Sequence, residues 1–122
     1  MRKSTDPPTR KPLSQPVIYI LLALAEGDRH GYAIKQEVES RTDGAIRLGP
    51  STLYEAIQRL LDGRLIEEAD PVARGTVNGQ EAQRRYYRLT ERGWTVLRDE
   101  IRHLGRIVDY ARSNPRVRKG LA

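Results

Sequence analysis

Polar side chains that could hydrogen-bond to the base edges of a nucleic acid recur along the segment 48–66. Its apolar residues fall at i, i+4, i+7 and i+8 and so form one helix face: Leu53, Ile57, Leu60 and Leu61. Hydroxyl, amide, aromatic and guanidinium groups lie away from that face: Ser51, Thr52, Tyr54, Gln58 and Arg59. Such groups can hydrogen-bond to base edges in a DNA major groove. A solvated amphipathic helix shows the same pattern, so the rest of the chain must separate the two interpretations.

The larger polar residues each have a structural alternative. Tyr54 can reach a phosphate or a base edge, or it can pack its ring at the edge of a helix bundle. Tyr32, near the start of the preceding helix, has the same two alternatives. Arg59 can contact DNA or pair with Glu55 one turn earlier.

Residue patterns typical of catalysis or metal binding are not found in the sequence. His30 and His103 are far apart, and neither has a cysteine or carboxylate at metal-ligand spacing. The adjacent Glu67 and Glu68 fall on a predicted strand, so their side chains point to opposite faces and cannot act as a pair. Ser51 and Thr52 have no recognisable base and are interpreted as helix caps. We therefore expect no enzyme activity, no metal and no cofactor.

Length and composition indicate a small cytoplasmic protein. The 122 residues correspond to about one domain. The chain has no cysteine, which excludes disulfides and fits a reducing compartment. The longest apolar run, residues 17–25, is far shorter than the ~20 residues that span a bilayer, and no signal peptide is visible. We expect no membrane partner.

The net charge of +6 is concentrated at the two ends of the chain. Residues 1–12 carry +3 and residues 112–122 carry +4, so the remainder carries −1. Basic tails support binding to a polyanion only weakly, and a basic surface on the folded part must therefore be a local patch. The candidates for that patch lie in or beside a predicted hairpin, where they would contact phosphate or the minor groove: Arg74, Arg84 and Arg85.

Caps and hydrophobic periodicity predict the elements that position these residues. Ser14 begins a first helix that is apolar on nearly every side and ends at Gly27. His30 opens a second helix, and Gly44 lies beyond its end. The third helix is the amphipathic one described above.

The third helix leads into a predicted hairpin. Residues 49–51 (GPS) start this helix, Thr52 and Glu55 resemble a capping box, and Gly63 ends the helix. Residues 65–69 and 84–89 alternate as two strands around a long loop rich in glycine and small polar residues. Three helices followed by a hairpin is the winged helix-turn-helix order, in which the third helix enters the major groove.

The last helix has the most regular apolar spacing. Thr90 caps it, and residues 91–112 would span ~33 Å at ~1.5 Å per residue. Its apolar positions follow at spacings of three and four, as in a heptad seam: Trp94, Leu97, Ile101, Leu104, Val108 and Ala111. A helix of this length overhangs a small domain, so we expect the seam to pair with a second copy in a homodimer. Packing back along its own domain is the alternative.

The expected fold is thus mostly helical with a small β-hairpin, in the order α-α-α-β-β-α. We divide the chain into four regions. Residues 1–12 form a flexible basic arm, and residues 13–89 form the winged helix-turn-helix domain. Residues 90–112 form the dimerisation helix, and residues 113–122 form a basic tail.

Three motifs resemble the PadR family of transcriptional regulators. Residues 30–34 (HGYAI) resemble the family signature at the start of the second helix. Residues 50–54 (PSTLY) with 60–66 (LLDGRLI) resemble its recognition helix and the following strand, and residues 85–93 (RYYRLTERG) resemble its second wing strand. The motifs occur in the family's order over residues 13–111, and a single helix after the hairpin is similar to the short branch of the family.

The resemblance implies a homodimeric DNA-binding protein that usually represses and is often released by a small molecule. Its expected partner is double-stranded DNA carrying an inverted repeat. A small aromatic or apolar effector would bind between the winged domain and the dimer helices, at a site lined by Tyr19, Leu22, Trp94, Leu97 and Ile101. The alternative is that these side chains simply fill the dimer core. The predicted wing loop, residues 70–83, is longer than is usual in the family.

A winged helix that docks on another protein without specific DNA binding is the competing function. Fold alone does not decide between the two. The polar outer face of the third helix favours DNA, because a protein-docking face would show exposed leucine or phenylalanine, and the chain contains no phenylalanine.

Overall fold

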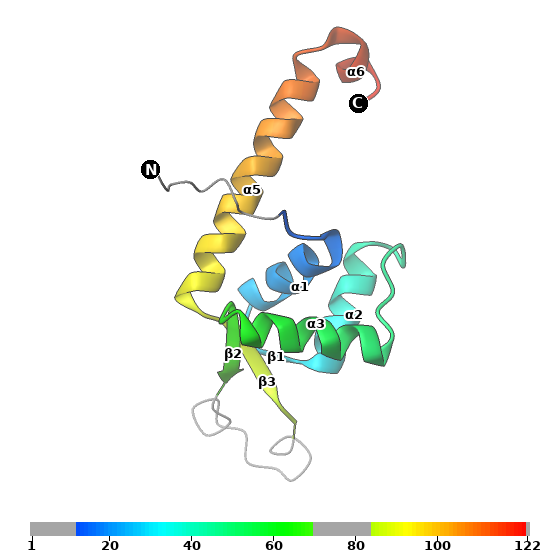
Figure 1. Cartoon of the computed structure of the whole chain (residues 1–122). Coiled ribbons are helices and arrows are strands. Elements are labelled where there is room, and N and C mark those ends of the chain that lie inside the picture. The colour runs from blue at the N-terminus through cyan, green and yellow to red at the C-terminus, as the bar shows by residue number, and fades with distance from the viewer. Residues whose placement is uncertain (1–11, 70–83, 122) are drawn as a thin grey trace, which may run out of the picture.

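The computed structural model describes residues 12–69 and 84–121, which are mostly helical with one small sheet (Figure 1). The elements in chain order are α1 (Gln15–Ala25), β1 (Arg29–His30), α2 (Gly31–Arg41), α3 (Pro50–Asp62), β2 (Ile66–Ala69), β3 (Tyr86–Leu89), α5 (Glu91–Arg112) and α6 (Pro115–Lys119). The predicted fold class is confirmed, and α5 has the predicted bounds. The expected arm up to residue 11 and the wing loop 70–83, with Arg74, lie outside the described residues.

The sheet differs from the predicted hairpin, because it has three antiparallel strands in the order β1-β3-β2. The sequence pattern does not predict β1, since two residues are too short to alternate visibly. Both hairpin strands are also shorter than expected. Pairing between β2 and β3 runs from Ala69 opposite Tyr86 to Ile66 opposite Leu89, so Arg84 and Arg85 precede the ladder.

A single apolar core joins the three helices to the sheet. The predicted apolar face of α3 is buried in it through Leu53, Ile57 and Leu60, while Leu61 is half-buried. Ile20 and Leu21 of α1 are fully buried at its centre. Full burial of each such side chain stabilises the fold by roughly 1.5–3 kcal/mol before conformational entropy is counted, and this holds α3 with its polar side outward.

The helix ends confirm some predicted caps and correct others. The Ser14 hydroxyl accepts a hydrogen bond from the Val17 backbone at 3.4 Å, and the Thr90 hydroxyl accepts one from Gly93 at 3.0 Å. The predicted start of α3 at residues 49–51 is confirmed, but the capping box at Thr52 is wrong, because Gly49 is the N-cap and Pro50 is the first helical residue. Proline has its φ preset for the first helical turn, so both Ser51 and Thr52 lie inside the helix and cap nothing.

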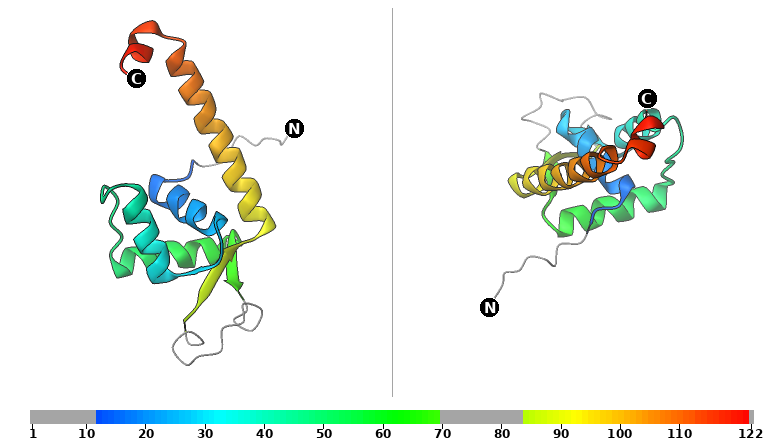
Figure 2. Two further views of the ribbon diagram at one scale, coloured as in Figure 1. Left: turned by 180° about the vertical axis from the view of Figure 1, so that it is seen from behind. Right: turned by 90° about the horizontal axis from the view of Figure 1, so that it is seen from above.

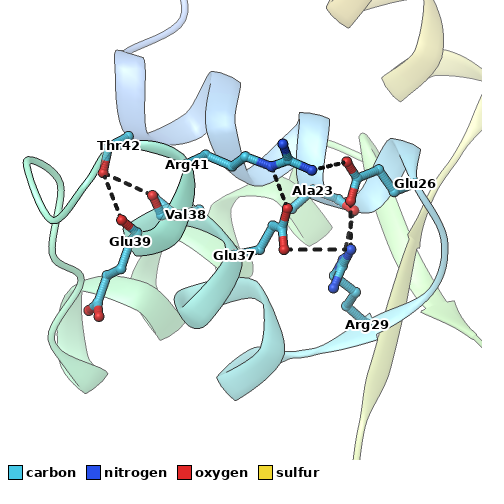
Figure 3. Close-up of polar contacts among 8 residues, drawn as sticks. All are labelled: Ala23, Glu26, Arg29, Glu37, Val38, Glu39, Arg41 and Thr42. Carbon is cyan, nitrogen blue, oxygen red and sulfur yellow. Dashed lines mark hydrogen bonds and ion pairs between the residues drawn. The ribbon is translucent and has the colours of Figure 1, made fainter.

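A network of charged side chains ties β1 to α1 and α2 (Figure 3). Arg29 of β1 donates to the Ala23 carbonyl at 2.9 Å and to the Glu26 carboxylate at 2.6 Å. Arg41, at the end of α2, donates to Glu37 at 2.7 Å and to Glu26 at 3.1 Å. The hydrogen bond and the positive charges lower the pKa of Glu37 below its usual value. The network fixes the short strand that leads into α2.

The long helix α5 starts against the sheet and then leaves the domain (Figures 1 and 2). At its start a side chain on Gly93 would collide with the Leu65 carbonyl oxygen, so only glycine allows this close approach. Leu97, one turn later, is buried in the domain core. Beyond residue 100 the helix projects away from α1, α2 and α3, and α6 lies at its far end, opposite the strands. Helix α6 falls within the expected basic tail. Within the described chain, the helices are too short or too polar to cross a bilayer.

Candidate nucleic-acid interface

The outer face of α3 presents the predicted set of polar side chains to solvent: Ser51, Thr52, Tyr54, Gln58 and Arg59. Ser51, Tyr54 and Gln58 follow at i, i+3 and i+7, so they share one stripe of the helix. The Gln58 amide donates to Asp62 at 2.9 Å. Glu55 and Arg59 both lie in the described part of the chain, and no ion pair joins them there. The predicted alternative partner for Arg59 is therefore wrong.

Three elements converge beside this face on an open hollow of about 380 Å³. The start of α2, the first turns of α3 and the root of the hairpin line it: His30, Gly31, Tyr32, Tyr54, Arg84, Arg85 and Tyr87. Four of these residues were predicted from the sequence to bind DNA, although they come from three separate parts of the chain: Tyr32, Tyr54, Arg84 and Arg85. The sheet produces this convergence, because β1 brings the start of α2 beside β3.

Tyr54 packs against a neighbouring element and also stays accessible to solvent. Its hydroxyl lies against Gly31, where an added Cβ would be only 2.8 Å away, yet the residue stays 52% exposed. The glycine in the HGYAI motif therefore has a packing reason, since it makes room for the Tyr54 ring. Tyr87 forms the inner wall of the hollow and is buried, and this burial, with the nearby Glu68 charge, raises the pKa of the Tyr87 phenol.

The cationic groups of the hollow come from the hairpin root. Arg85 lies 3.7 Å from the Glu68 carboxylate, and both side chains are largely exposed. Exposed pairs of this kind contribute at most ~1 kcal/mol, so phosphate could replace the carboxylate at little cost. Arg84 is also exposed, and its Nη1 lies 3.0 Å from the Nε2 of His30. The two arginines give the hollow the local positive charge that the net charge of residues 13–111 does not reveal.

Tyr32 lies at the rim, where it is 58% exposed. The Lys35 ammonium lies 5.9 Å from the centre of its ring, within the range of a cation–π contact. This exposure disfavours the packing alternative for Tyr32. The same ammonium pairs with Glu39 at 2.9 Å, so Lys35 is a partly neutralised cation beside Tyr32 that sequence reasoning did not select.

His30 is the lining residue that sequence reasoning interpreted only as a helix start. Its Nδ1 accepts a hydrogen bond from the Ala33 backbone at 3.2 Å, so it does cap α2. Its ring also packs edge-on against Tyr86, with centroids 5.2 Å apart and planes at 86°. A histidine directly before a helix is a signal that could have suggested the cap, but the contacts to Tyr86 and Arg84 depend on the sheet.

The predicted dimer seam is divided between two environments. Leu97 is buried by its own chain, while Trp94, Ile101 and Val108 stay 37%, 42% and 44% exposed. Leu104 and Ala111 are half-buried. The alternative of packing back on the domain therefore applies to Leu97, and the domain leaves Trp94, Ile101 and Val108 exposed.

The five residues predicted to line an effector site do not all line the same hollow. Leu22, Trp94, Leu97 and Ile101 line one open hollow of about 380 Å³ between α1 and α5, together with Ala25, Arg98 and Arg102. Tyr19 lines a different hollow, of about 440 Å³, between α1 and α2. Leu22 and Ala25 belong to both hollows, so the two adjoin across α1.

The described residues hold no group of three or more histidine, cysteine, aspartate or glutamate side chains placed to bind a metal ion. The groups gathered at the hollow are instead hydrogen-bond donors and cations. Together with three helices, a small antiparallel sheet and the polar outer face of α3, they define the chain as a winged helix-turn-helix protein.

Comparison with known proteins gives the family. The sequence profile of the transcriptional regulator PadR-like family matches residues 20–99. Protein X of Lysinibacillus sphaericus is 35% identical over 83 residues, which are 68% of this chain and 72% of that protein. The chain belongs to the PadR-like family of transcriptional regulators.

Solved structures agree on the fold. A PadR family transcriptional regulator from Eggerthella lenta is 31% identical, with a TM-score of 0.58 over 76% of this chain and 74% of that one. Bacillus subtilis PadR in complex with operator DNA is 23% identical, with a TM-score of 0.60 over 75% of this chain. The match spans about half of the Bacillus protein, 48% of its length. That similarity establishes the shared fold alone.

Proposed function

We propose that this protein is a sequence-specific regulator that binds double-stranded DNA through the winged domain, residues 13–89. The observation that best supports this proposal is the hollow where α2, α3 and the hairpin root meet. Tyr54, Arg84 and Arg85 lie there, beside the polar face of α3. In this arrangement α3 lies in the major groove, where Arg59 and Gln58 read base edges. The hairpin and the start of α2 hold the phosphates and fix the register. Family membership and the operator complex of Bacillus subtilis PadR support the proposal.

The decisive experiment is selection of bound duplexes from a random library with the full chain. An inverted repeat is expected, and affinity for it should fall with salt by about 0.9 log units per log unit for each neutralised phosphate. Arg59→Ala should weaken cognate binding by roughly 1–3 kcal/mol if it reads a base. Arg88→Ala removes a charge that is paired with Glu67 at 2.9 Å, and it serves as the control. Recovery of no preferred sequence, with weak and salt-insensitive binding, would favour the protein-docking alternative.

The homodimer is part of this proposal, with residues 90–112 as its dimerisation helix. The exposed side chains of the outer half of α5 support it, because Ile101 and Val108 leave apolar surface in water. Pairing two copies through α5 would set the recognition helices about one DNA turn apart, ~34 Å, on successive major grooves. We propose repression as the output, since a dimer on an inverted repeat would block access to that DNA.

We also propose that a flat aromatic or apolar effector acts at the hollow between α1 and α5. The support is its lining by Leu22, Trp94 and Ile101, all of them partly exposed. Only a ligand with unequal affinity for the DNA-free and DNA-bound forms could release the operator. Trp94 is the single tryptophan, so its fluorescence reports on this site. Titration with planar aromatic compounds should quench it and weaken operator binding in parallel. Quenching that leaves operator affinity unchanged would argue against a regulatory site.

A further inference from the structure

Three consecutive backbone carbonyls directly after α3 accept hydrogen bonds from the start of α5. The Arg92 Nε donates to the Gly63 carbonyl at 3.1 Å. The Thr90 hydroxyl donates to the Arg64 carbonyl at 2.6 Å, and the Thr90 backbone N–H donates to the Leu65 carbonyl at 3.1 Å. These five residues form a connection between the two helices that we call the α3–α5 joint.

The joint is fixed at both of its ends. On the α3 side, the Leu65 N–H donates to the Leu60 carbonyl at 2.9 Å, which ties the joint to the last turn of α3. On the α5 side, the Thr90 hydroxyl also accepts from the Gly93 N–H at 3.0 Å, so the group that holds α3 also caps α5. A rotation of α5 about its first turn must therefore break these bonds or carry the end of α3 with it.

A further contact of α5 with the domain restrains the helix in a different way. Leu97, one turn beyond Gly93, is buried in the apolar core. Apolar packing is non-directional and mainly fixes how close two elements lie, whereas a hydrogen bond weakens steeply when its angle changes. The hydrogen bonds of the joint therefore restrain the direction in which α5 leaves the domain (Figure 1).

The direction of α5 relative to α3 matters when a dimer binds two half-sites. Adding one base pair between the half-sites moves one of them by ~3.4 Å and rotates it by ~35° about the DNA axis. A dimer held together through α5 can follow that change only if α3 turns relative to α5. Such a turn strains the hydrogen bonds of the joint, so the joint penalises every spacing except the one that suits it.

We propose that Thr90 and Arg92 are positioning residues that set the half-site spacing of the operator. Neither side chain contacts DNA in this arrangement, and both act through the carbonyls that follow α3. The outer face of α3 selects the sequence of each half-site, while the joint selects the distance and the rotation between the two. This inference rests on the proposed DNA-binding dimer and adds a determinant of specificity that lies outside its DNA-contacting surface.

The first test measures the affinity of the full chain for duplexes that carry the selected half-sites at different spacings. Arg92→Ala removes one hydrogen bond of the joint and leaves a good helix former in α5. The ratio of affinities between the best spacing and one base pair more should fall about three- to tenfold, the factor for one lost hydrogen bond. Arg88→Ala is the charge-matched control, because its guanidinium pairs with Glu67 at 2.9 Å, and it should keep the ratio. A uniform loss of affinity cancels in this ratio, so an unchanged ratio for Arg92→Ala overturns the proposal.

The second test separates positioning from stability. Thr90→Val removes the hydroxyl at nearly constant volume, so it should lower both the melting temperature and the spacing ratio. Thr90→Ser keeps the hydroxyl and should restore both. Ile34→Val lowers stability through the buried core of α2, away from the joint, and should leave the spacing ratio unchanged. If Ile34→Val reduces the ratio as much as Thr90→Val does, stability alone explains the effect and the proposal is overturned.

The third test observes the joint without DNA. The chain has no cysteine, so Glu55→Cys on the exposed face of α3 provides a single site for a spin label. Pulsed electron paramagnetic resonance then measures the distance between the two α3 helices of a dimer. We expect a narrow distribution that widens when Arg92→Ala is added, and equal widths overturn the proposal. Failure of the unmodified protein to bind any duplex would instead reject the proposed function, and the role of the joint with it.

Discussion

The two halves of α5 have the same apolar spacing and different environments. In the first half, Gly93, Leu97 and Glu100 are buried, although Trp94 is 37% exposed. In the second half, Ile101, Ile107 and Val108 are 42%, 50% and 44% exposed. A heptad pattern states only that a helix has an apolar stripe, and it does not identify the surface that covers it. Here the domain covers one end of the stripe, and we propose that a second copy covers the other.

The largest difference between the halves should appear on removing one apolar side chain from each. Leu97→Ala leaves a cavity in the domain core and should lower the free energy of unfolding by ~2–5 kcal/mol. Val108→Ala removes a side chain that solvent already reaches, so within one protomer it should cost less than ~0.5 kcal/mol. Denaturant unfolding at several protein concentrations measures both values. Equal losses in dilute protein would mean that the seam is not divided as described.

The two glycines of α5 offer a second contrast, with opposite signs. Gly93→Ala would push its methyl group into the Leu65 carbonyl, and overpacking of this kind costs ~1–3 kcal/mol. An added Cβ at Gly105 meets no atom within 4 Å, so Gly105→Ala should stabilise the helix by about 0.5–1 kcal/mol. The melting temperature should fall for the first variant and rise for the second. A fall for both would show that position 105 is also closely packed.

The third contrast concerns assembly and leaves the fold of the protomer intact. Ile101→Asp places a charge on the exposed part of the seam, where an apolar interface would have to bury it. We expect monomers by light scattering, an unchanged helical content and the loss of tight binding to an inverted repeat. If the unmodified protein is already monomeric at micromolar concentration, the second half of α5 has another partner or none.

The smallest expected effect is the acid sensitivity of the domain itself. Hydrogen bonding to Arg41 lowers the pKa of Glu37 below its usual 4.5 in the folded chain. A lowered folded pKa contributes stability above the unfolded value, and this contribution is lost as the pH falls below about 4.5. Unfolding measured from pH 6 to pH 3 should show a slightly steeper loss for the unmodified protein than for Glu37→Gln. The effect should be small, because Glu37 and Arg41 lie at the surface.

Much of the fold was predictable because it depends on near neighbours in the sequence. The bounds of α5 follow from Thr90 and from an apolar spacing that spans three or four residues at a time. The failed capping box at Thr52 also has a local cause. Helix α3 begins at Pro50 with Gly49 as its N-cap, so Thr52 already lies inside the helix. Several neighbouring residues have the composition of a helix N-cap, and only the backbone geometry shows which of them is the cap.

The candidate interface was predictable as residue types but not as a site. Tyr32, Tyr54, Arg84 and Arg85 stood out because exposed aromatic and cationic residues suit a polyanion. Their meeting in one hollow required β1, a two-residue strand without a visible pattern. His30 was interpreted only as a helix start, since its contact with Arg84 joins residues 54 positions apart.

The sequence alone determined the helices, the hairpin, the polar face of α3 and the family to which the chain belongs, because caps, periodicity and motifs act over a few residues. Only the tertiary structure decided which part of the α5 seam is covered by its own domain. It alone also brought Arg84 of the hairpin root within 3.0 Å of the His30 ring. The physical reason is that burial and hydrogen-bond geometry depend on distances in space, and the packed core sets those distances only once the distant segments have met.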